Sequence, residues 1–287
     1  MVHFAVMAAE AIEWLALRPE GTYLDATAGL GGHTAEIARR LTTGKVIAND
    51  RDAESLEIAR RNTAEWADRI CFHWGEFSRL AAALPACGAG QVDGLLADLG
   101  VSRYQLTEPE RGFSFMADGP LDMRIDKSAG TTAAGVVNSY AEKAIADLIF
   151  QLGEERRARK IARAIVRARP IRSTLHLAGV VEQAVPRTSR LHPATRTFMA
   201  LRMFVNGEQA ELDRLLEIGP ELLAAGGRMV VISFTSLEDR KVKQQFRGLE
   251  REGRATVLTK HPLTPTAAET SVNPASRSAK LRVLEMK

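Results

Sequence analysis

The chain has 287 residues, of which 45% are hydrophobic and 26% are charged, a composition typical of a globular protein with one large domain or one domain and an insertion. Its formal net charge of +4 and pI of about 9.2 are compatible with a nucleic-acid partner and do not by themselves establish one. No apolar run approaches membrane-spanning length, and the charges between Glu10 and Glu20 exclude a signal-peptide core. Cys71 and Cys87 lie outside any C-x-x-C motif, so we expect reduced, buried thiols of a cytoplasmic protein.

The first hundred residues alternate between strand-like and helical patterns. Four short apolar runs predict strands, at 22–25, 45–50, 69–74 and 92–98. The segments between them predict helices, at 35–41, 53–66 and 77–84. This alternation is typical of a parallel, doubly wound α/β sheet.

The alternation stops near residue 102. No convincing strand follows until about residue 196, whereas helical patterns recur at 141–152, 154–169 and 174–185. The pattern predicts a helical insertion at 103–200, flanked by two parts of one domain at 1–102 and 201–287.

Strand–helix order then resumes. A helix is predicted at 208–223, a strand at 227–234, and a helix from Leu237, where Ser236-Leu237-Glu238-Asp239 resembles a capping box. The last two strands are predicted at 255–260 and 280–285. Seven strands with a returning final hairpin are the usual architecture of class I methyltransferases, which have a Rossmann-like sheet.

The run from Asp25 to Thr34 indicates a strand end, a glycine turn and a helix start, and Asp50 ends the next predicted strand. In an open α/β sheet these strand ends lie side by side, where nucleotides bind, and Asp50 can accept both ribose hydroxyls. A dinucleotide site expects G-x-G-x-x-G, but Thr34 stands at its third position and the extra glycine is Gly32. The G-x-G-G form favours S-adenosylmethionine, with a nicotinamide cofactor or an empty glycine turn as the alternatives.

Asp98 ends the fourth predicted strand and faces the same crevice. Enzymes that methylate exocyclic amines of bases place an acceptor here, because it can bind one N–H and take up developing positive charge. The usual Pro-Pro-aromatic does not follow, so base stacking must come from elsewhere, with Tyr104, Phe113 and Phe115 as candidates. The alternative is a strand-terminal carboxylate that caps the next turn.

A basic run extends from Arg156 to Arg172, with eight basic residues and no acidic one. Four of its cations recur at helical spacing and would form a phosphate-binding face of the insertion: Arg156, Lys160, Arg163 and Arg167. The alternative is a solvated helix face opposite the apolar Ile161 and Ile165.

Taken together, the chain resembles the bacterial 16S rRNA (cytosine-N4)-methyltransferase family, also called the RsmH or MraW family. The most specific blocks are 25–34, 98–102, 110–126, 192–206, 231–243 and 273–282. The chain departs from the family pattern at Thr235, where His is usual, and at Arg103-Tyr104, where Ser-Pro is commoner.

The resemblance implies a class I domain with a helical insertion and a specific reaction. The reaction would move a methyl group from S-adenosylmethionine to N4 of a cytidine in the decoding region of 16S rRNA, within the small ribosomal subunit. By the family motifs, the cofactor contacts would be Gly31, Gly32, His33, Asp50, Phe77, Asp98 and Gln105, with Asp98 also catalytic and no metal. Oligomeric state stays open, with a homodimer as one option.

Three other functions compete with this interpretation. A DNA amino-methyltransferase is disfavoured because Asp98-Leu99-Gly100 lacks the Pro-Pro-aromatic. A nicotinamide dehydrogenase is disfavoured by Thr34 in place of glycine. A non-catalytic RNA-binding module would not need the carboxylate of Asp50 at a strand end.

Overall fold

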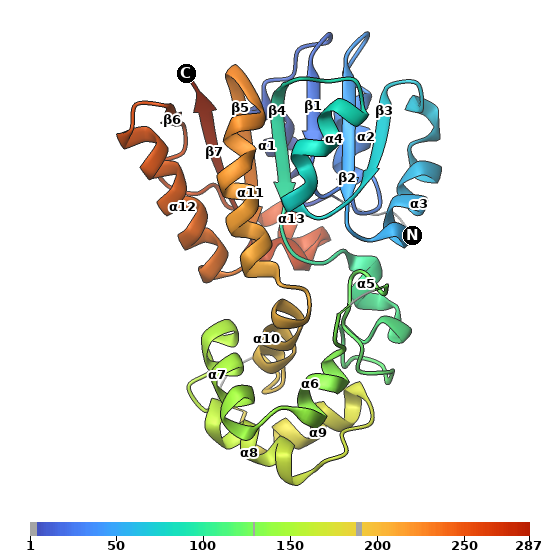
Figure 1. Cartoon of the computed structure of the whole chain (residues 1–287), viewed down its shortest axis with the longest axis vertical. Coiled ribbons are helices and arrows are strands. Elements are labelled where there is room, and N and C mark those ends of the chain that lie inside the picture. Colours follow the sequence, from blue (N-terminus) through green and yellow to red (C-terminus); the bar gives the residue numbers. More distant parts are fainter. Residues whose placement is uncertain (1–4, 129, 188–190) are drawn as a thin grey trace. The chain divides into compact units, whose positions relative to one another are not determined.

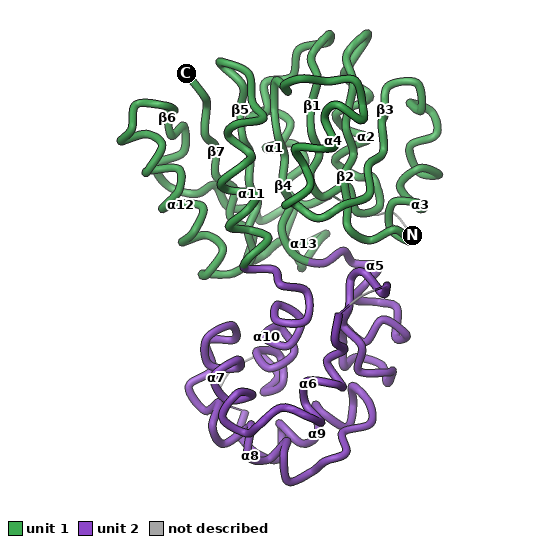
Figure 2. Tube along the Cα trace, in the orientation of Figure 1, with its two compact units in different colours: residues 1–100, 210–287 green, residues 101–209 purple. Residues whose placement is uncertain are grey.

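The computed structural model describes residues 5–128, 130–187 and 191–287, and it divides the chain into two compact units. The sheet unit comprises residues 1–100 and 210–287, and the helical unit comprises residues 101–209 (Figure 2). Within the described ranges, no helix is both long enough and apolar enough to cross a membrane.

The sheet unit is built on one seven-stranded sheet with the order β3-β2-β1-β4-β5-β7-β6 (Figure 1). Neighbours from β3 to β5 run parallel, and β7 lies antiparallel between β5 and β6. The strands are β1 Thr22–Asp25, β2 Lys45–Asp50, β3 Ile70–Trp74, β4 Val92–Asp98, β5 Leu223–Ser233, β6 Ala255–Val257 and β7 Lys280–Met286. The predicted class I α/β fold with its returning final hairpin is confirmed.

Successive strand residues point to opposite faces of the sheet, so each face has its own apolar core. In β4, Leu95 packs into the core under α4, α11 and α12, whereas Leu96 packs into the core under α1, α2 and α3. Figure 1 shows α4 and α11 on the near side of the sheet and α1 and α2 behind it. These helices are α1 Ala8–Leu15, α2 Gly32–Ala38, α3 Ala53–Asn62, α4 Leu80–Ala86, α11 Glu208–Leu222 and α12 Ser236–Arg251. Shorter elements are α13 Ala267–Val272 and the 3₁₀ turns Ala64–Trp66, Phe77–Arg79 and Pro274–Ser278.

The helical unit has a separate core and, among its described residues, no strand. Its core side chains include Val136, Ile145, Ile161, Leu177 and Leu201, each inaccessible to solvent. The helices are α5 Arg103–Thr107, α6 Ala133–Ser139, α7 Glu142–Gly153, α8 Ala158–Arg167, α9 Thr174–Ala184 and α10 Thr195–Val205, with a 3₁₀ turn at Pro109–Arg111.

The start of α12 corrects one prediction. Its capping box begins at Thr235, not at Ser236: the Thr235 hydroxyl accepts from the Glu238 N–H, and the Glu238 carboxylate accepts from the Thr235 N–H. The Glu238 carboxylate also accepts from the Phe234 N–H at 2.9 Å, so it binds two consecutive backbone N–H groups ahead of the helix. The residue that departs from the family pattern therefore serves as the helix cap.

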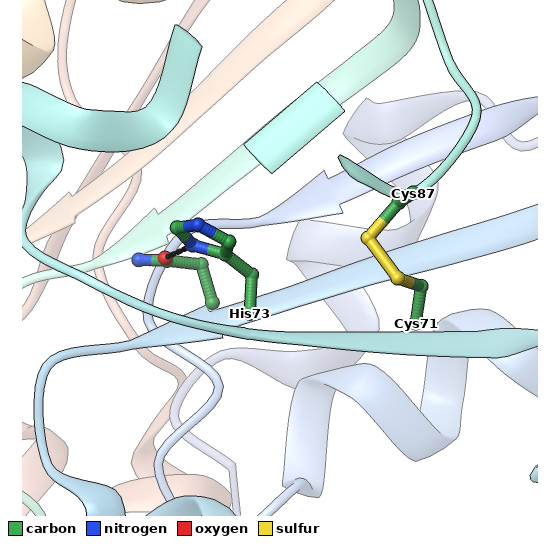
Figure 3. The surroundings of a disulfide bond; sticks show 4 residues. Cys71, His73 and Cys87 are labelled. Carbon is green, nitrogen blue, oxygen red and sulfur yellow. Dashed lines mark hydrogen bonds between the residues drawn. A yellow bond between two sulfur atoms is a disulfide. The ribbon is translucent and has the colours of Figure 1, made fainter. Parts of the chain in front are cut away.

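The predicted pair of reduced, buried thiols is wrong. Cys71 in β3 and Cys87 at the end of α4 form a disulfide, with their Cα atoms 5.8 Å apart, and both residues are only partly buried (Figure 3). The pairing arises because α4 returns along the sheet, which brings a residue 16 positions later in the chain back to β3. His73 is also on β3, and its Nδ1 lies 2.8 Å from Oδ1 of Asn49 on the neighbouring strand β2.

Removing the disulfide should lower the stability of the sheet unit. A loop of this length gives roughly 2–4 kcal/mol of unfolding free energy, chiefly by restricting the unfolded chain. We expect that loss in a Cys71→Ser/Cys87→Ser variant, measured by urea unfolding against the oxidised wild type. An identical midpoint for the variant and the oxidised protein would show that the bond does not stabilise the fold.

Candidate active site

Three aspartates end adjacent parallel strands. Asp25 ends β1, Asp50 ends β2 and Asp98 ends β4, and β1 pairs with both β2 and β4. The carboxyl ends of these strands therefore meet at one edge of the sheet, the position where open α/β sheets bind ligands.

The glycine turn after β1 leads directly to this edge. Gly29 and Gly31 both have positive φ, at 51° and 89°. A Cβ on Gly31 would lie 2.9 Å from the Thr63 methyl, so only glycine fits there. The turn brings the Gly29 N–H within 2.8 Å of the Asp50 carboxylate. Helix α2 begins at Gly32, directly after Gly31.

Asp50 is held by backbone donors and retains acceptor capacity. Its Oδ2 accepts from the Gly29 N–H, and its Oδ1 accepts from the Asp52 N–H at 2.8 Å. A carboxylate has about four lone-pair sites, so each oxygen can accept one further hydrogen bond. Burial raises the pKa of Asp50 to about 6, against the opposing effect of these two hydrogen bonds.

Asp25 and two threonines fix the neighbouring strand end. The Thr34 hydroxyl donates to Asp25 Oδ2 at 2.6 Å, and the Thr27 N–H donates to Asp25 Oδ1 at 3.2 Å. Thr27 in turn accepts from the Asp98 N–H at 2.7 Å through its hydroxyl oxygen. Asp25 is inaccessible to solvent, and burial raises its pKa to about 6.

The side chain of Asp98 is 21% exposed, but its Oδ1 atom is buried, and the carboxyl group is incompletely paired. Its Oδ1 accepts no hydrogen bond within the described residues, and its Oδ2 lies 3.8 Å from His33 Nδ1. Burial raises the pKa of Asp98 well above its ordinary value, and the nearby carboxylates of Asp25, Glu238 and Glu269 raise it further. A buried acceptor without a donor is unfavourable on its own, which is typical of a position completed by a ligand.

His33 is a neutral ring built into the same wall. It is only 4% exposed, and its Nε2–H donates to the Val6 carbonyl at 3.0 Å. Burial lowers the pKa of His33 to about 4. Because the carbonyl can only accept, the hydrogen lies on Nε2 and the lone pair of Nδ1 faces the Asp98 carboxyl group.

The chemistry of this edge fits S-adenosylmethionine. Buried carboxyl groups without a Lys or Arg partner favour a cation, and this cofactor carries a sulfonium and an ammonium. Its ribose hydroxyls suit the remaining acceptor sites of Asp50. The same edge would repel the two negative charges of a dinucleotide pyrophosphate, which disfavours a nicotinamide cofactor.

Five of the predicted site residues meet at this edge: Gly31, Gly32, His33, Asp50 and Asp98. Phe77 begins the 3₁₀ turn after β3 and packs partly against the sheet core. Gln105 belongs to the helical unit, where its Oε1 accepts from the Ser102 N–H at 2.8 Å in the capping box of α5.

Sequence reasoning missed three residues around Asp98. Thr27 stands inside the glycine block and could have been noticed as a hydroxyl two residues after a strand end. Glu238 and Glu269 carry no such signal, because only the fold brings α12 and α13 near the end of β4.

Most of the basic run lies on α8 of the helical unit, with Arg156 just before the helix and Arg169 and Arg172 after it. Arg156, Lys160, Arg163 and Arg167 are exposed, whereas Ile161 and Ile165 are buried on the other side. Arg163 lies 3.6 Å from Glu142, which offsets one of these four positive charges, so the face as a whole stays basic. The helical unit as a whole contains 17 Lys and Arg against 11 Asp and Glu, whereas the sheet unit contains 22 against 24.

The fold, the glycine turn and the acidic edge define a class I methyltransferase that uses S-adenosylmethionine. Residues 1–287 match the profile of the MraW methylase family, and the chain belongs to that family. It is 71% identical over 286 residues to Ribosomal RNA small subunit methyltransferase H of Solibacter usitatus, with 100% of both chains covered. It is 50% identical over 295 residues to the protein of the same name from Acidobacterium capsulatum, with 99% of this chain and 98% of that protein covered.

A solved rRNA methylase from Streptococcus thermophilus is similar at 14% identity and a TM-score of 0.41, over 97% of this chain and 93% of that one.

Cofactor affinity should fall as the pH falls below about 6, if Asp50 receives the ribose hydroxyls. The pKa of this carboxyl is raised to about 6, so it is ionised at pH 7 and mostly protonated at pH 5. A protonated carboxyl loses acceptor capacity, and we expect roughly tenfold weaker binding of S-adenosylmethionine at pH 5 than at pH 7 by calorimetry.

Asp50→Asn should bind more weakly at pH 7, by roughly 1–3 kcal/mol, and should lose most of the pH dependence. Asp213→Asn, an exposed carboxylate paired with Lys241 on the sheet unit, is the matched control. Equal affinities of Asp50→Asn and wild type at both pH values would remove Asp50 from the cofactor site.

Proposed function

We propose that this protein methylates N4 of a cytidine in the decoding region of 16S rRNA, with S-adenosylmethionine as methyl donor. Methylation of small-subunit rRNA rests on membership of the MraW methylase family and on relatives named Ribosomal RNA small subunit methyltransferase H. The choice of an amine nitrogen rests on one observation, the buried and unpaired Oδ1 of Asp98.

An exocyclic amine of cytosine is a poor nucleophile because its lone pair is delocalised into the ring. When bound, the cofactor supplies an electrophilic methyl group on a sulfonium. Asp98 Oδ1 accepts one N–H of the amine, which favours a pyramidal nitrogen and stabilises the positive charge that develops on it. The raised pKa of Asp98 makes the carboxylate a stronger base than an ordinary aspartate, so it can take the proton that the amine releases.

The remaining edge residues would hold the cofactor. Asp50 would receive the ribose hydroxyls, and Gly31 and Gly32 would let the backbone approach the methionine moiety closely. His33, whose Nε2–H donates to the Val6 carbonyl at 3.0 Å, would contact the cofactor on the basis of the family motif. Phe77 and Gln105 complete the proposed cofactor contacts on the basis of the family motifs.

The insertion at 103–200 would bind the RNA, and the protein would act in the cytoplasm, where small subunits are assembled. The support is its charge, because a surface rich in Arg and Lys gains affinity for phosphates by releasing counterions. A cytosine amine in a duplex is engaged in pairing, so the target base must be unpaired or flipped. The assembled small subunit would present such a base and serve as the substrate.

A gene deletion tests this function. Nuclease digestion and mass spectrometry of 16S rRNA from the deletion strain should show the loss of one N4-methylcytidine mark in the decoding region, restored by the wild-type gene. Asp98→Asn should lower restoration, because removing one electrostatic contact to the reacting group slows turnover by about 10²-fold.

Asp93→Asn is the matched control for this experiment, because Asp93 is on the same strand and its carboxylate accepts from the Thr22 N–H at 2.8 Å. Persistence of every rRNA methyl mark in the deletion strain would contradict the substrate assignment. Full restoration by Asp98→Asn would contradict the role of that carboxyl group.

The basic face of α8 should contribute to the salt dependence of subunit binding. Changing Lys160, Arg163 and Arg167 to Gln removes three positive charges that are exposed. If each contacts a phosphate, the slope of log affinity against log salt should become less negative by about two to three. Arg214, Arg247 and Arg254 of the sheet unit, changed together to Gln, give the same charge change outside this face. Equal slopes for the two triple variants would show that the α8 face is only solvated surface.

A further inference from the structure

A cavity of about 410 Å³ lies inside the helical unit, where the chain enters α8 and α10. Three arginines line it, Arg156, Arg157 and Arg196, together with an apolar wall of Pro186, Leu191 and Pro193. Its size falls within the range of small-molecule sites in proteins. Arg156, Pro186, Leu191 and Arg196 are exposed, so the cavity is accessible from solvent.

The three arginines differ in the contacts that they already make. Arg157 lies 3.1 Å from Glu155 and donates to the Pro186 carbonyl at 2.9 Å, which neutralises the one carboxylate of the lining and fixes its wall. Arg196 uses one nitrogen to donate to the Glu154 carbonyl at 2.8 Å. Arg156 has no hydrogen bond or ion pair with a described residue. The guanidinium of Arg156 and the remaining donors of Arg196 are therefore available to an anion in the cavity.

The cavity also has an apolar wall, and the His192 ring beside it in the chain is packed. Leu191 lines the cavity and is 58% exposed. The neighbouring His192 ring packs on Phe115 with ring centroids 4.7 Å apart, and Phe115 packs on Phe198 at 4.8 Å. Pro186 and Leu191 are exposed and present apolar surface to the cavity, against which the face of a base can pack.

We propose that this cavity binds one unpaired nucleotide of the substrate RNA, with its phosphate on Arg156 and Arg196 and its base on Pro186 and Leu191. The inference rests on the proposed RNA substrate and adds a site for a nucleotide other than the one that is methylated, because the one carboxylate of the cavity, Glu155, is already paired with Arg157. It differs from the charges of Lys160, Arg163 and Arg167 on α8, which would position an RNA backbone through its phosphates.

Two single variants and a matched control test the cavity. Arg156→Gln and Arg196→Gln each remove one cavity guanidinium, whereas Arg159→Gln removes an exposed arginine of α8 that does not line the cavity. We expect each cavity variant to bind small ribosomal subunits about tenfold more weakly than wild type, and Arg159→Gln to lose less than about twofold. Unfolding temperatures check that each variant is folded.

Uridine 5′-monophosphate is the direct probe. Saturation-transfer NMR with the full chain should show contacts to the base protons in wild type and Arg159→Gln, and a signal at least about fivefold lower in Arg156→Gln and Arg196→Gln. Uridine alone and inorganic phosphate alone should each bind more weakly than the nucleotide, because each lacks one half of the recognition.

Equal behaviour of the cavity variants and Arg159→Gln in both measurements overturns the proposal. Weaker subunit binding with an unchanged nucleotide signal also overturns it, since the occupant would then be an acidic protein segment. A methylation assay with wild-type protein tests the proposed function separately. If that function is wrong, small subunits stay unmethylated, whatever the nucleotide signal shows.

Discussion

The burial of three carboxyl groups at one sheet edge is the constraint on which the rest of the site depends. Asp25, Asp50 and Asp98 end neighbouring strands, and none forms an ion pair with a Lys or Arg of the described chain. Backbone N–H groups and the Thr34 hydroxyl donate to Asp25 and Asp50 instead, whereas Asp98 Oδ1 has no donor, so the loss of hydration is only partly offset. Asp25 is inaccessible to solvent, whereas Asp50 and Asp98 are partly exposed, so the edge is open to a ligand at these two residues.

This arrangement links stability to function. A carboxyl group whose pKa is raised on folding stabilises the fold most below its unfolded pKa, and that contribution is lost as the pH rises through the folded value. For Asp25 and Asp50 this stabilisation is lost between about pH 4 and pH 6. At neutral pH both groups are ionised, and their burial then lowers the stability of the fold. A cationic cofactor relieves that repulsion. The same field excludes phosphates from the edge, while the basic helical unit carries the excess of positive charge that RNA requires.

Much of the fold could be predicted because buried parallel strands are continuous apolar runs. The strands at 22–25, 45–50 and 92–98 have the predicted bounds, since each apolar run is followed at once by a polar turn. The edge strand β6 is shorter than predicted, ending at Val257. The disulfide and the proximity of Glu269 to Asp98 could not be predicted, because they depend on how distant segments return to the sheet. The spacing of the glycines predicted the turn that contacts Asp50, but only the structure shows that Asp98 Oδ1 lacks a donor.

The most direct test is the titration of these carboxyl groups in the cofactor-free protein. Selective labelling of aspartate at the carboxyl carbon, followed by NMR over pH 3–9, reports each group, and Asp25→Asn, Asp50→Asn and Asp98→Asn assign the signals. The account predicts two carboxyls that titrate near pH 6, assigned to Asp25 and Asp50, and a third, Asp98, well above the ordinary aspartate range. Ordinary titration near pH 4 for all three would contradict the desolvated edge and the chemistry inferred from it.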